Sequence, residues 1–183
     1  MPIVTSRLLL RPPQAGDGAR LTAAKRESWA ALSRWLAFAD KPIESINDTE
    51  DEIYVRQKHS QFILRTDLTL LVFDRQGTEL IGSSGLHDLD WEARVMSLGY
   101  WMRTSKTGNG YAAEVALALT KYAFEHLGAN RLTISHADGN VRSQRIIEKL
   151  GFEKEGVSRK SYLLQGQLVD AHHYARLNTH GLP

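Results

Sequence analysis

The sequence predicts a single-domain α/β fold, with a mixed but mostly antiparallel central sheet and helices on both faces. Residues 69–102 hold three apolar segments joined by short polar links, which is typical of an antiparallel meander. Residues 111–127 then place apolar side chains at helical spacing, and residues 131–136 return to a strand pattern. The length of 183 residues and the 42% hydrophobic content suit one compact domain over residues 1–183.

The first half of the chain predicts one strand, two helices and then the meander. The strand covers residues 3–11 and ends at Pro12, because proline lacks the amide hydrogen that a sheet ladder uses. Helices are expected over residues 17–38 and 48–64. The strands of the meander are expected over residues 69–73, 80–86 and 95–102.

The second half of the chain predicts a helix, a strand, a short helix and a closing hairpin. The first helix, over residues 111–127, has one apolar face. The strand follows over residues 131–136, and Gly151 is placed to cap a helix over residues 143–150. Residues 162–177 leave room for the hairpin, which completes a sheet with helices on both faces.

Composition excludes several classes of function. The chain has no cysteine, so a disulfide, a thiolate metal site and a cysteine nucleophile are all ruled out. The formal net charge of +2 is too small to indicate a nucleic-acid partner. No apolar run approaches the roughly twenty residues that cross a bilayer, so we expect no membrane partner and a cytoplasmic location.

Adjacent histidines near the C-terminus raise the question of a metal site. His172 and His173 are neighbours on a predicted strand, and neighbouring strand residues point to opposite faces. Asp170 and His172 share a face, but two ligands are too few for a zinc site. We therefore expect a salt-linked surface pair between Asp170 and His172, and no metal.

The glycine-containing turn before the helix expected over residues 111–127 predicts a phosphate site. Gly108 and Gly110 allow a close backbone approach to an anion, because neither carries a Cβ atom. The helix that follows has unpaired N–H groups and a partial positive charge at its start. A phosphorylated cofactor is therefore expected here, and the expected contacts are Thr107, Gly108, Asn109, Gly110, Tyr111 and Ala112.

A dinucleotide-binding domain is the first alternative for this turn. Residues 108–113 satisfy the pattern G-x-G-x-x-A, which is a weak signal alone. Such a domain needs further strand and helix units after the turn, and only about seventy residues remain. The short strands before the turn also argue against a doubly wound sheet.

The same turn resembles the acetyl-CoA site of the GCN5-related N-acetyltransferase superfamily. Its pyrophosphate motif, Gln/Arg-x-x-Gly-x-Gly/Ala, is similar to residues 107–112 at both small positions, with Thr107 where Gln or Arg is usual. Asn140-Val-Arg-Ser143 and Glu148-Lys-Leu-Gly-Phe152 resemble two further blocks of that superfamily. Thr5-Ser-Arg-Leu-Leu-Leu-Arg-Pro12 resembles the opening strand of its RimJ/RimL-like branch.

The resemblance implies an enzyme that transfers acetyl from acetyl-CoA to a primary amine, by direct attack in a ternary complex. A protein N-terminal α-amine is the first choice of acceptor. A small amine, such as a polyamine, an amino acid or an antibiotic, is the second. A non-catalytic acyl-CoA-binding module is the third reading, and a homodimer is left open.

The resemblance also assigns coenzyme contacts beyond the turn. It implies that the strand carrying Tyr100, Trp101 and Met102 separates from its neighbour and pairs with the pantetheine amides. It further implies that Asn140 bonds the pantetheine arm, although a helix N-cap explains the same residue. Ser143 takes the place of a serine near the coenzyme sulfur.

Two departures from the superfamily leave the catalytic groups to be assigned. Ile147 stands where many members carry a tyrosine that protonates the sulfur, so Ser143 is our expected proton donor. Ser97 stands where many carry a glutamate base. His87 is our expected substitute, because imidazole titrates near neutral pH, and a water relay to solvent is the alternative.

The acceptor is expected beside the first helix. Trp35 and Asp40 belong to a segment that the resemblance places along the acceptor groove. An exposed aromatic wall can hold an extended peptide, and a carboxylate can attract its ammonium group.

Overall fold

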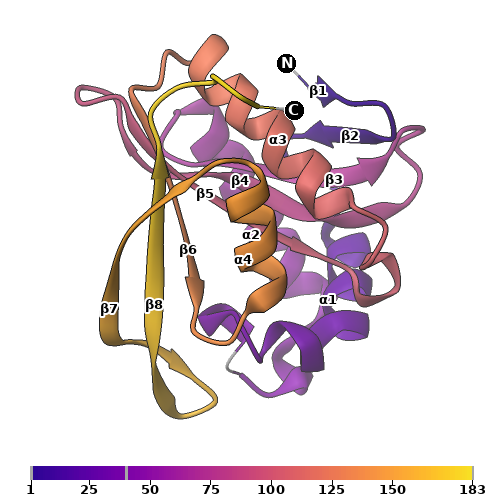
Figure 1. Cartoon of the computed structure of the whole chain (residues 1–183). Coiled ribbons are helices and arrows are strands. Elements are labelled where there is room, and N and C mark those ends of the chain that lie inside the picture. The colour runs from indigo at the N-terminus through magenta and orange to yellow at the C-terminus, as the bar shows by residue number, and fades with distance from the viewer. Residues whose placement is uncertain (1, 40, 183) are drawn as a thin grey trace.

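A computed structural model describes residues 2–39 and 41–182, and these residues form an eight-stranded mixed sheet in the order β1-β2-β3-β4-β5-β6-β8-β7 (Figure 1). Its strands are β1 (Ile3–Val4), β2 (Leu8–Arg11), β3 (Leu68–Asp74), β4 (Leu80–Asp90), β5 (Val95–Met102), β6 (Arg131–Ala137), β7 (Glu153–Leu164) and β8 (Gln167–Arg176). The helices are α1 (Gly18–Leu32), α2 (Asp48–Ile63), α3 (Tyr111–Glu125) and α4 (Val141–Lys149). Short 3-10 turns occupy η1 (Ala37–Ala39), η2 (Ile43–Ser45) and η3 (Thr104–Lys106).

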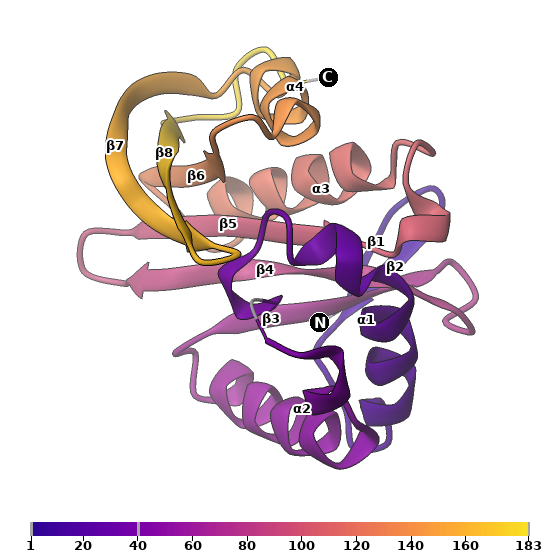
Figure 2. The same cartoon turned by 90° about the horizontal axis from the view of Figure 1, so that it is seen from below.

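Helices cover both faces of the sheet, as the sequence predicts. Helices α1 and α2 lie on one face, and α3 and α4 lie on the other (Figure 2). On the α3 face, Leu119 packs into a core with Leu132 of β6. On the α1 face, Leu21 and Val55 enclose Phe73 of β3. The mixed, mostly antiparallel α/β class predicted from the sequence is confirmed.

The sheet opens between β5 and β6, and this opening positions the site. The two strands run parallel but pair only at three positions, from Val95 opposite Arg131 to Ser97 opposite Thr133. Strand β5 continues to Met102 with β4 on one side only. The chain then passes through η3 into α3, so the turn before α3 lies where β5 ends (Figure 2).

Two expected elements at the N-terminal end are shorter than predicted. Residues 3–11 form two strands joined by a turn, rather than one strand. The first helix ends at Leu32 instead of residue 38, because the chain bends back on itself: Trp29 donates from Nε1 to the Lys41 carbonyl at 2.9 Å, and its ring meets that of Phe38 edge-on. A straight helix would carry Phe38 about 13 Å along its axis from Trp29, beyond ring contact.

The closing hairpin begins earlier than predicted. Strand β7 starts at Glu153, nine residues before the predicted range, and is exposed along most of its length. It therefore lacks the apolar alternation that identifies a half-buried strand. Gln165 and Gly166 both have positive φ, as a tight two-residue hairpin turn requires.

In the described part of the chain, no helix is long and apolar enough to cross a membrane.

Candidate active site

The turn before α3 has the backbone geometry of an anion cradle. Gly108 has φ of +81° and Gly110 has φ of +78°, in the left-handed region that glycine enters without strain. The amide of Glu114 makes the bond to the Gly110 carbonyl that opens the helix, so the amides just before Glu114 are the unpaired donors of the helix start. A Cβ at Gly108 would meet no atom within 4 Å, which leaves open space over the turn. These features fit a pyrophosphate group.

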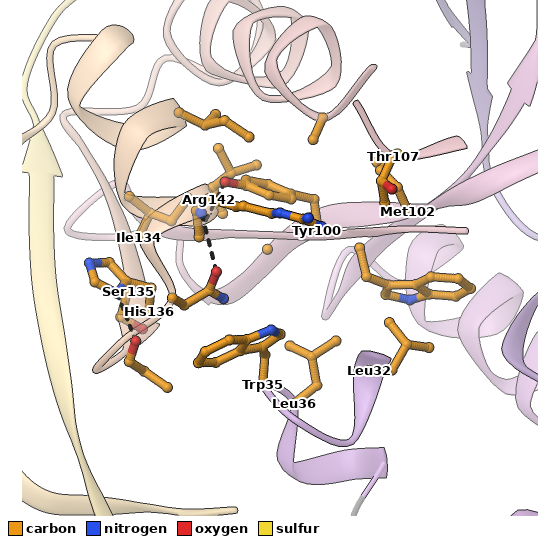
Figure 3. Close-up of a pocket in the computed structure, with 18 of the residues that line it drawn as sticks. Leu32, Trp35, Leu36, Tyr100, Met102, Thr107, Ile134, Ser135, His136 and Arg142 are labelled. Carbon is orange, nitrogen blue, oxygen red and sulfur yellow. Dashed lines mark hydrogen bonds between the residues drawn. The ribbon is translucent and has the colours of Figure 1, made fainter. Parts of the chain in front are cut away.

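A cavity of about 460 Å³ connects this turn to the opposite face of the sheet. It follows the opening between β5 and β6, so the same cavity contacts Gly110, Tyr100 and Ser143. On its other side lie Leu32 and Leu36, from the end of α1 and the segment that follows (Figure 3). The cavity therefore has room for a long ligand that passes between the strands.

Strand β5 offers free backbone groups to this cavity. The amide of Arg103 donates to Ile81 of β4 at 2.8 Å, and bonding alternates along an antiparallel strand. Tyr100 and Met102 consequently direct their backbone groups toward the opening, where an amide-bearing ligand can pair with them. Trp101 differs from the expectation: its backbone belongs to the ladder with β4, and its side chain lines the cavity on the α1 face.

Two hydroxyl groups meet near the middle of the cavity. The Tyr100 hydroxyl lies 3.1 Å from Ser143 Oγ. Burial raises the pKa of Tyr100 to about 12, against the lowering effect of this hydrogen bond, so the phenol keeps its proton at neutral pH. Ile147, which stands where many members of the superfamily carry a tyrosine, is fully buried in the core. The sequence analysis predicts a role only for the backbone of Tyr100 and none for its hydroxyl.

Asn140 acts as the N-cap of α4. Its Oδ1 accepts from the Ser143 amide at 3.2 Å, which occupies one acceptor and leaves the amide group of the side chain for other partners. Asn140 also lines the cavity beside Ser143. The helix cap therefore holds both residues at the same point of the cleft.

His87 is oriented by a carboxylate. Its Nδ1 lies 3.0 Å from Asp67 Oδ2, and its ring lies over Gly99, where the absence of a Cβ leaves it space. Burial alone would raise the pKa of Asp67, but hydrogen bonds from His87, Thr69 and Lys58 lower it below its usual range. Asp67 therefore stays ionised and holds the imidazole.

The partner of His87 could not be found by spacing. Asp67 lies twenty residues earlier in the chain, just before β3, and no motif marks it. Ser97 pairs directly opposite His87 across β4 and β5, and both line the cavity.

Trp35 lines the cavity on the same side as Leu32 and Leu36 and is partly buried. Figure 3 shows it across the cavity from Tyr100. Its ring also comes within 3.8 Å of the position that a Cβ on Gly139 would take, just before Asn140. Asp40, the other expected acceptor residue, lies outside the described residues.

The predicted Asp170–His172 pair is wrong. His172 Nε2 lies 2.9 Å from Asp138 Oδ1, and Asp170 accepts instead from the Lys160 amide at 2.8 Å. A bulge in β7 between Ser158 and Tyr162 brings that amide to Asp170. Within residues 2–39 and 41–182, no group of three or more histidine and acidic side chains could hold a metal ion.

Comparisons with known proteins agree with this geometry. Residues 7–153 match the family model described as an acetyltransferase (GNAT) domain. The "Putative ribosomal N-acetyltransferase YdaF" of Bacillus subtilis is 30% identical over 175 residues, which cover 95% of this chain and 93% of that protein. The "[Ribosomal protein uS5]-alanine N-acetyltransferase" of Escherichia coli is 28% identical over 100 residues, about half of each chain. The fold matches RimL, a "Ribosomal L7/L12 alpha-N-protein acetyltransferase" solved with coenzyme A, with a TM-score of 0.87, 21% identity and coverage of 98% and 99%.

The chain belongs to the GNAT acetyltransferase family. It is an acetyl-CoA-dependent N-acetyltransferase of the RimJ/RimL-like branch, and acetyl-CoA is the group that the cradle and the cleft fit. This outcome excludes the dinucleotide-binding domain considered from the sequence.

Proposed function

We propose that this enzyme acetylates the N-terminal α-amine of a protein. The observation that carries the proposal is the continuation of the coenzyme cleft past Ser143 to the α1 face, where Trp35 and Leu36 form one wall. An extended peptide end can enter such a cleft and rest against an aromatic ring. The names of two relatives support the same acceptor class: one is the "Putative ribosomal N-acetyltransferase YdaF" and the other a "[Ribosomal protein uS5]-alanine N-acetyltransferase".

Bound acetyl-CoA supplies the acetyl thioester, and the protein must supply an amine without its proton. We propose His87 as the base that accepts this proton at Nε2, with Asp67 fixing the proton on Nδ1. An α-amine has a pKa of roughly 7.7 to 8.0, so most of it carries a proton at neutral pH and a base is needed to remove that proton. A serine at position 97 cannot take this role, since it is a poor base.

The departing thiolate needs a proton, and we propose that Ser143 donates it. The Tyr100 phenol then replaces the proton on Ser143 through the hydrogen bond between the two hydroxyls, and regains its own proton from solvent that enters the cavity after the products leave. The backbone N–H groups of Tyr100 and Met102 orient acetyl-CoA in the gap between β5 and β6. The proposed acid, Ser143, and the proposed base, His87, line the same cavity.

Acetylation of a peptide panel tests the acceptor class. The purified protein is incubated with acetyl-CoA and either peptides with free N-termini or spermidine, and products are identified by mass spectrometry. We expect Trp35→Ala to raise KM for the best peptide about tenfold and to leave KM for acetyl-CoA unchanged. Trp91→Ala is the control, because Trp91 lies in the turn between β4 and β5, where its Nε1 bonds the Arg65 carbonyl.

Spermidine acetylation without any peptide product would assign the enzyme to small amines instead. Equal KM values for the peptide in the Trp35→Ala variant and the unaltered protein would place the acceptor away from this wall. The cytoplasmic location and the lack of nucleic-acid and membrane partners stay predictions, and a homodimer stays open.

A further inference from the structure

The N-terminal segment holds the start of α3 by a set of hydrogen bonds to one carboxylate. Glu114, in the first turn of α3, accepts from Thr5 Oγ1 at 2.5 Å, Ser6 Oγ at 3.2 Å and the Arg7 amide at 3.1 Å. Arg7 Nε also donates to Glu114 Oε2 at 2.7 Å. Burial alone would raise the pKa of Glu114, but the bonds from Thr5 and Arg7 lower it, so the carboxylate is ionised at neutral pH.

Arg7 extends this contact to the pyrophosphate turn itself. Its Nη1 donates to the Asn109 carbonyl at 2.8 Å, and its guanidinium lies 4.6 Å from the centre of the Tyr111 ring. A peptide unit is planar and trans, so a fixed carbonyl also fixes the N–H of the next residue on the opposite side. By holding the Asn109 carbonyl, Arg7 sets the direction of the Gly110 N–H, one of the donors of the cradle.

The charges at this point support the same role. A carboxylate at the start of α3 would repel a pyrophosphate bound close by, and the ion pair with Arg7 offsets that charge. Thr107 cannot replace Arg7, because its hydroxyl bonds the Thr104 carbonyl at 2.8 Å. Lys106, directly before the turn, is paired with Glu79 at 2.7 Å, so the cation that contacts the Asn109 carbonyl comes from a segment about one hundred residues earlier in the chain.

We propose that Arg7 is a positioning residue for the pyrophosphate of acetyl-CoA, acting through the Asn109–Gly110 peptide. The inference rests on the use of acetyl-CoA and adds a role for the N-terminal Thr5-Ser-Arg7 motif. It requires that Arg7 act on every ligand that carries the pyrophosphate and on none that lacks it.

Isothermal titration of the whole chain tests this requirement with three ligands. CoA and 3′-dephospho-CoA both carry the pyrophosphate, whereas pantetheine, measured at millimolar concentration, lacks it. We expect Arg7→Ala to lower the affinity for CoA and for dephospho-CoA by the same factor of about ten, and to leave the affinity for pantetheine unchanged. Arg7→Lys keeps the charge but lacks the planar fork of separate nitrogens that contacts both Glu114 and Asn109, so it is expected to recover only part of this loss.

The control variant is Arg75→Ala. Arg75 lies in the turn between β3 and β4 and donates to the Thr5 carbonyl at 2.8 Å, so it supports the same N-terminal turn from the side away from the Asn109 carbonyl. It should bind all three ligands as the unaltered protein does.

Three outcomes would overturn the proposal. An unchanged CoA affinity in Arg7→Ala would show that Arg7 does not contribute to binding. An equal loss of pantetheine affinity would show that Arg7 supports the structure in general and not the pyrophosphate site. A loss confined to CoA would show that Arg7 acts on the 3′-phosphate by charge. Failure of the unaltered protein to bind CoA would instead refute the use of the coenzyme, and this result is seen before any variant is made.

Discussion

The paired hydroxyls of Tyr100 and Ser143 give the sharpest test of the proposed chemistry. The perturbations are Ser143→Ala, Tyr100→Phe and the double variant. In the unaltered protein the two oxygens are 3.1 Å apart, and the pKa of Tyr100 is raised by burial to about 12. The phenol is therefore a proton donor at neutral pH and not a base.

The structure sets the size of the expected effects. A positioned acid contributes roughly 10² to 10⁴ in rate, and a water can replace part of it in so open a cleft, so Ser143→Ala should lower kcat about 10²-fold. Tyr100→Phe removes only the second hydroxyl and should lower kcat about tenfold. If the phenol acts through Ser143, the double variant should be about as slow as Ser143→Ala alone, because the relay is already broken.

Release of the CoA thiol, followed under saturating acetyl-CoA, measures these rates, and titration with CoA checks that binding is intact. Ser83→Ala is the control, since it loses a comparable buried hydroxyl bond, to the Leu70 carbonyl at 3.1 Å, on a neighbouring strand. An unchanged kcat in Ser143→Ala would refute the donor assignment. Losses that multiply in the double variant would show that the two hydroxyls act independently.

Three further predictions follow from backbone strain, the base and burial. Gly110→Val should abolish measurable CoA binding by titration and cost about 1–3 kcal/mol in unfolding free energy, because φ of +78° strains a β-branched residue; Gly128→Val, at φ of +68° beyond α3, should share the strain but bind CoA normally. His87→Ala should lower kcat/KM and change the acidic limb of its pH profile, and Asp67→Asn should lower kcat/KM as well; a pH profile identical to that of the unaltered protein would indicate deprotonation through solvent. Burial lowers the pKa of His136, so the unfolded chain binds this proton first and stability should fall as pH drops below about 6.5; parallel stability curves for the unaltered protein and His136→Gln would contradict this.

The elements that the sequence predicted well are those with one buried face. Residues 95–102 were predicted to the residue, and β5 alternates in burial over its first four residues. Helix α3 ends within two residues of the predicted boundary, since its buried side chains repeat along one side. Strand β7 was predicted too short because its side chains are mostly exposed and show no apolar alternation. Its extended conformation depends on pairing with β8 and not on its own sequence pattern.

The site divides in the same way between local and distant signals. The turn over residues 107–112 was predicted because consecutive residues form it, and Ser143 with Asn140 because a helix start brings them together. The contact of His87 with Asp67 and the contact of Ser143 with Tyr100 join different elements of the fold. Spacing along one sequence carries no information on such pairs, so neither was predicted.

The three departures from the superfamily pattern share one physical explanation. Where a glutamate is usual, Ser97 faces an imidazole held by Asp67; where a tyrosine donor is usual, Ile147 packs in the core and a phenol on β5 reaches Ser143 instead. Where a long polar side chain is usual, Thr107 is short, and a guanidinium from the N-terminal turn reaches the same loop. The backbone cradle and the gap between β5 and β6 define where charge and protons are needed, so a side chain from any element that borders them can meet the need. A motif comparison at fixed positions therefore misses side chains that reach the same cleft from other elements of the fold.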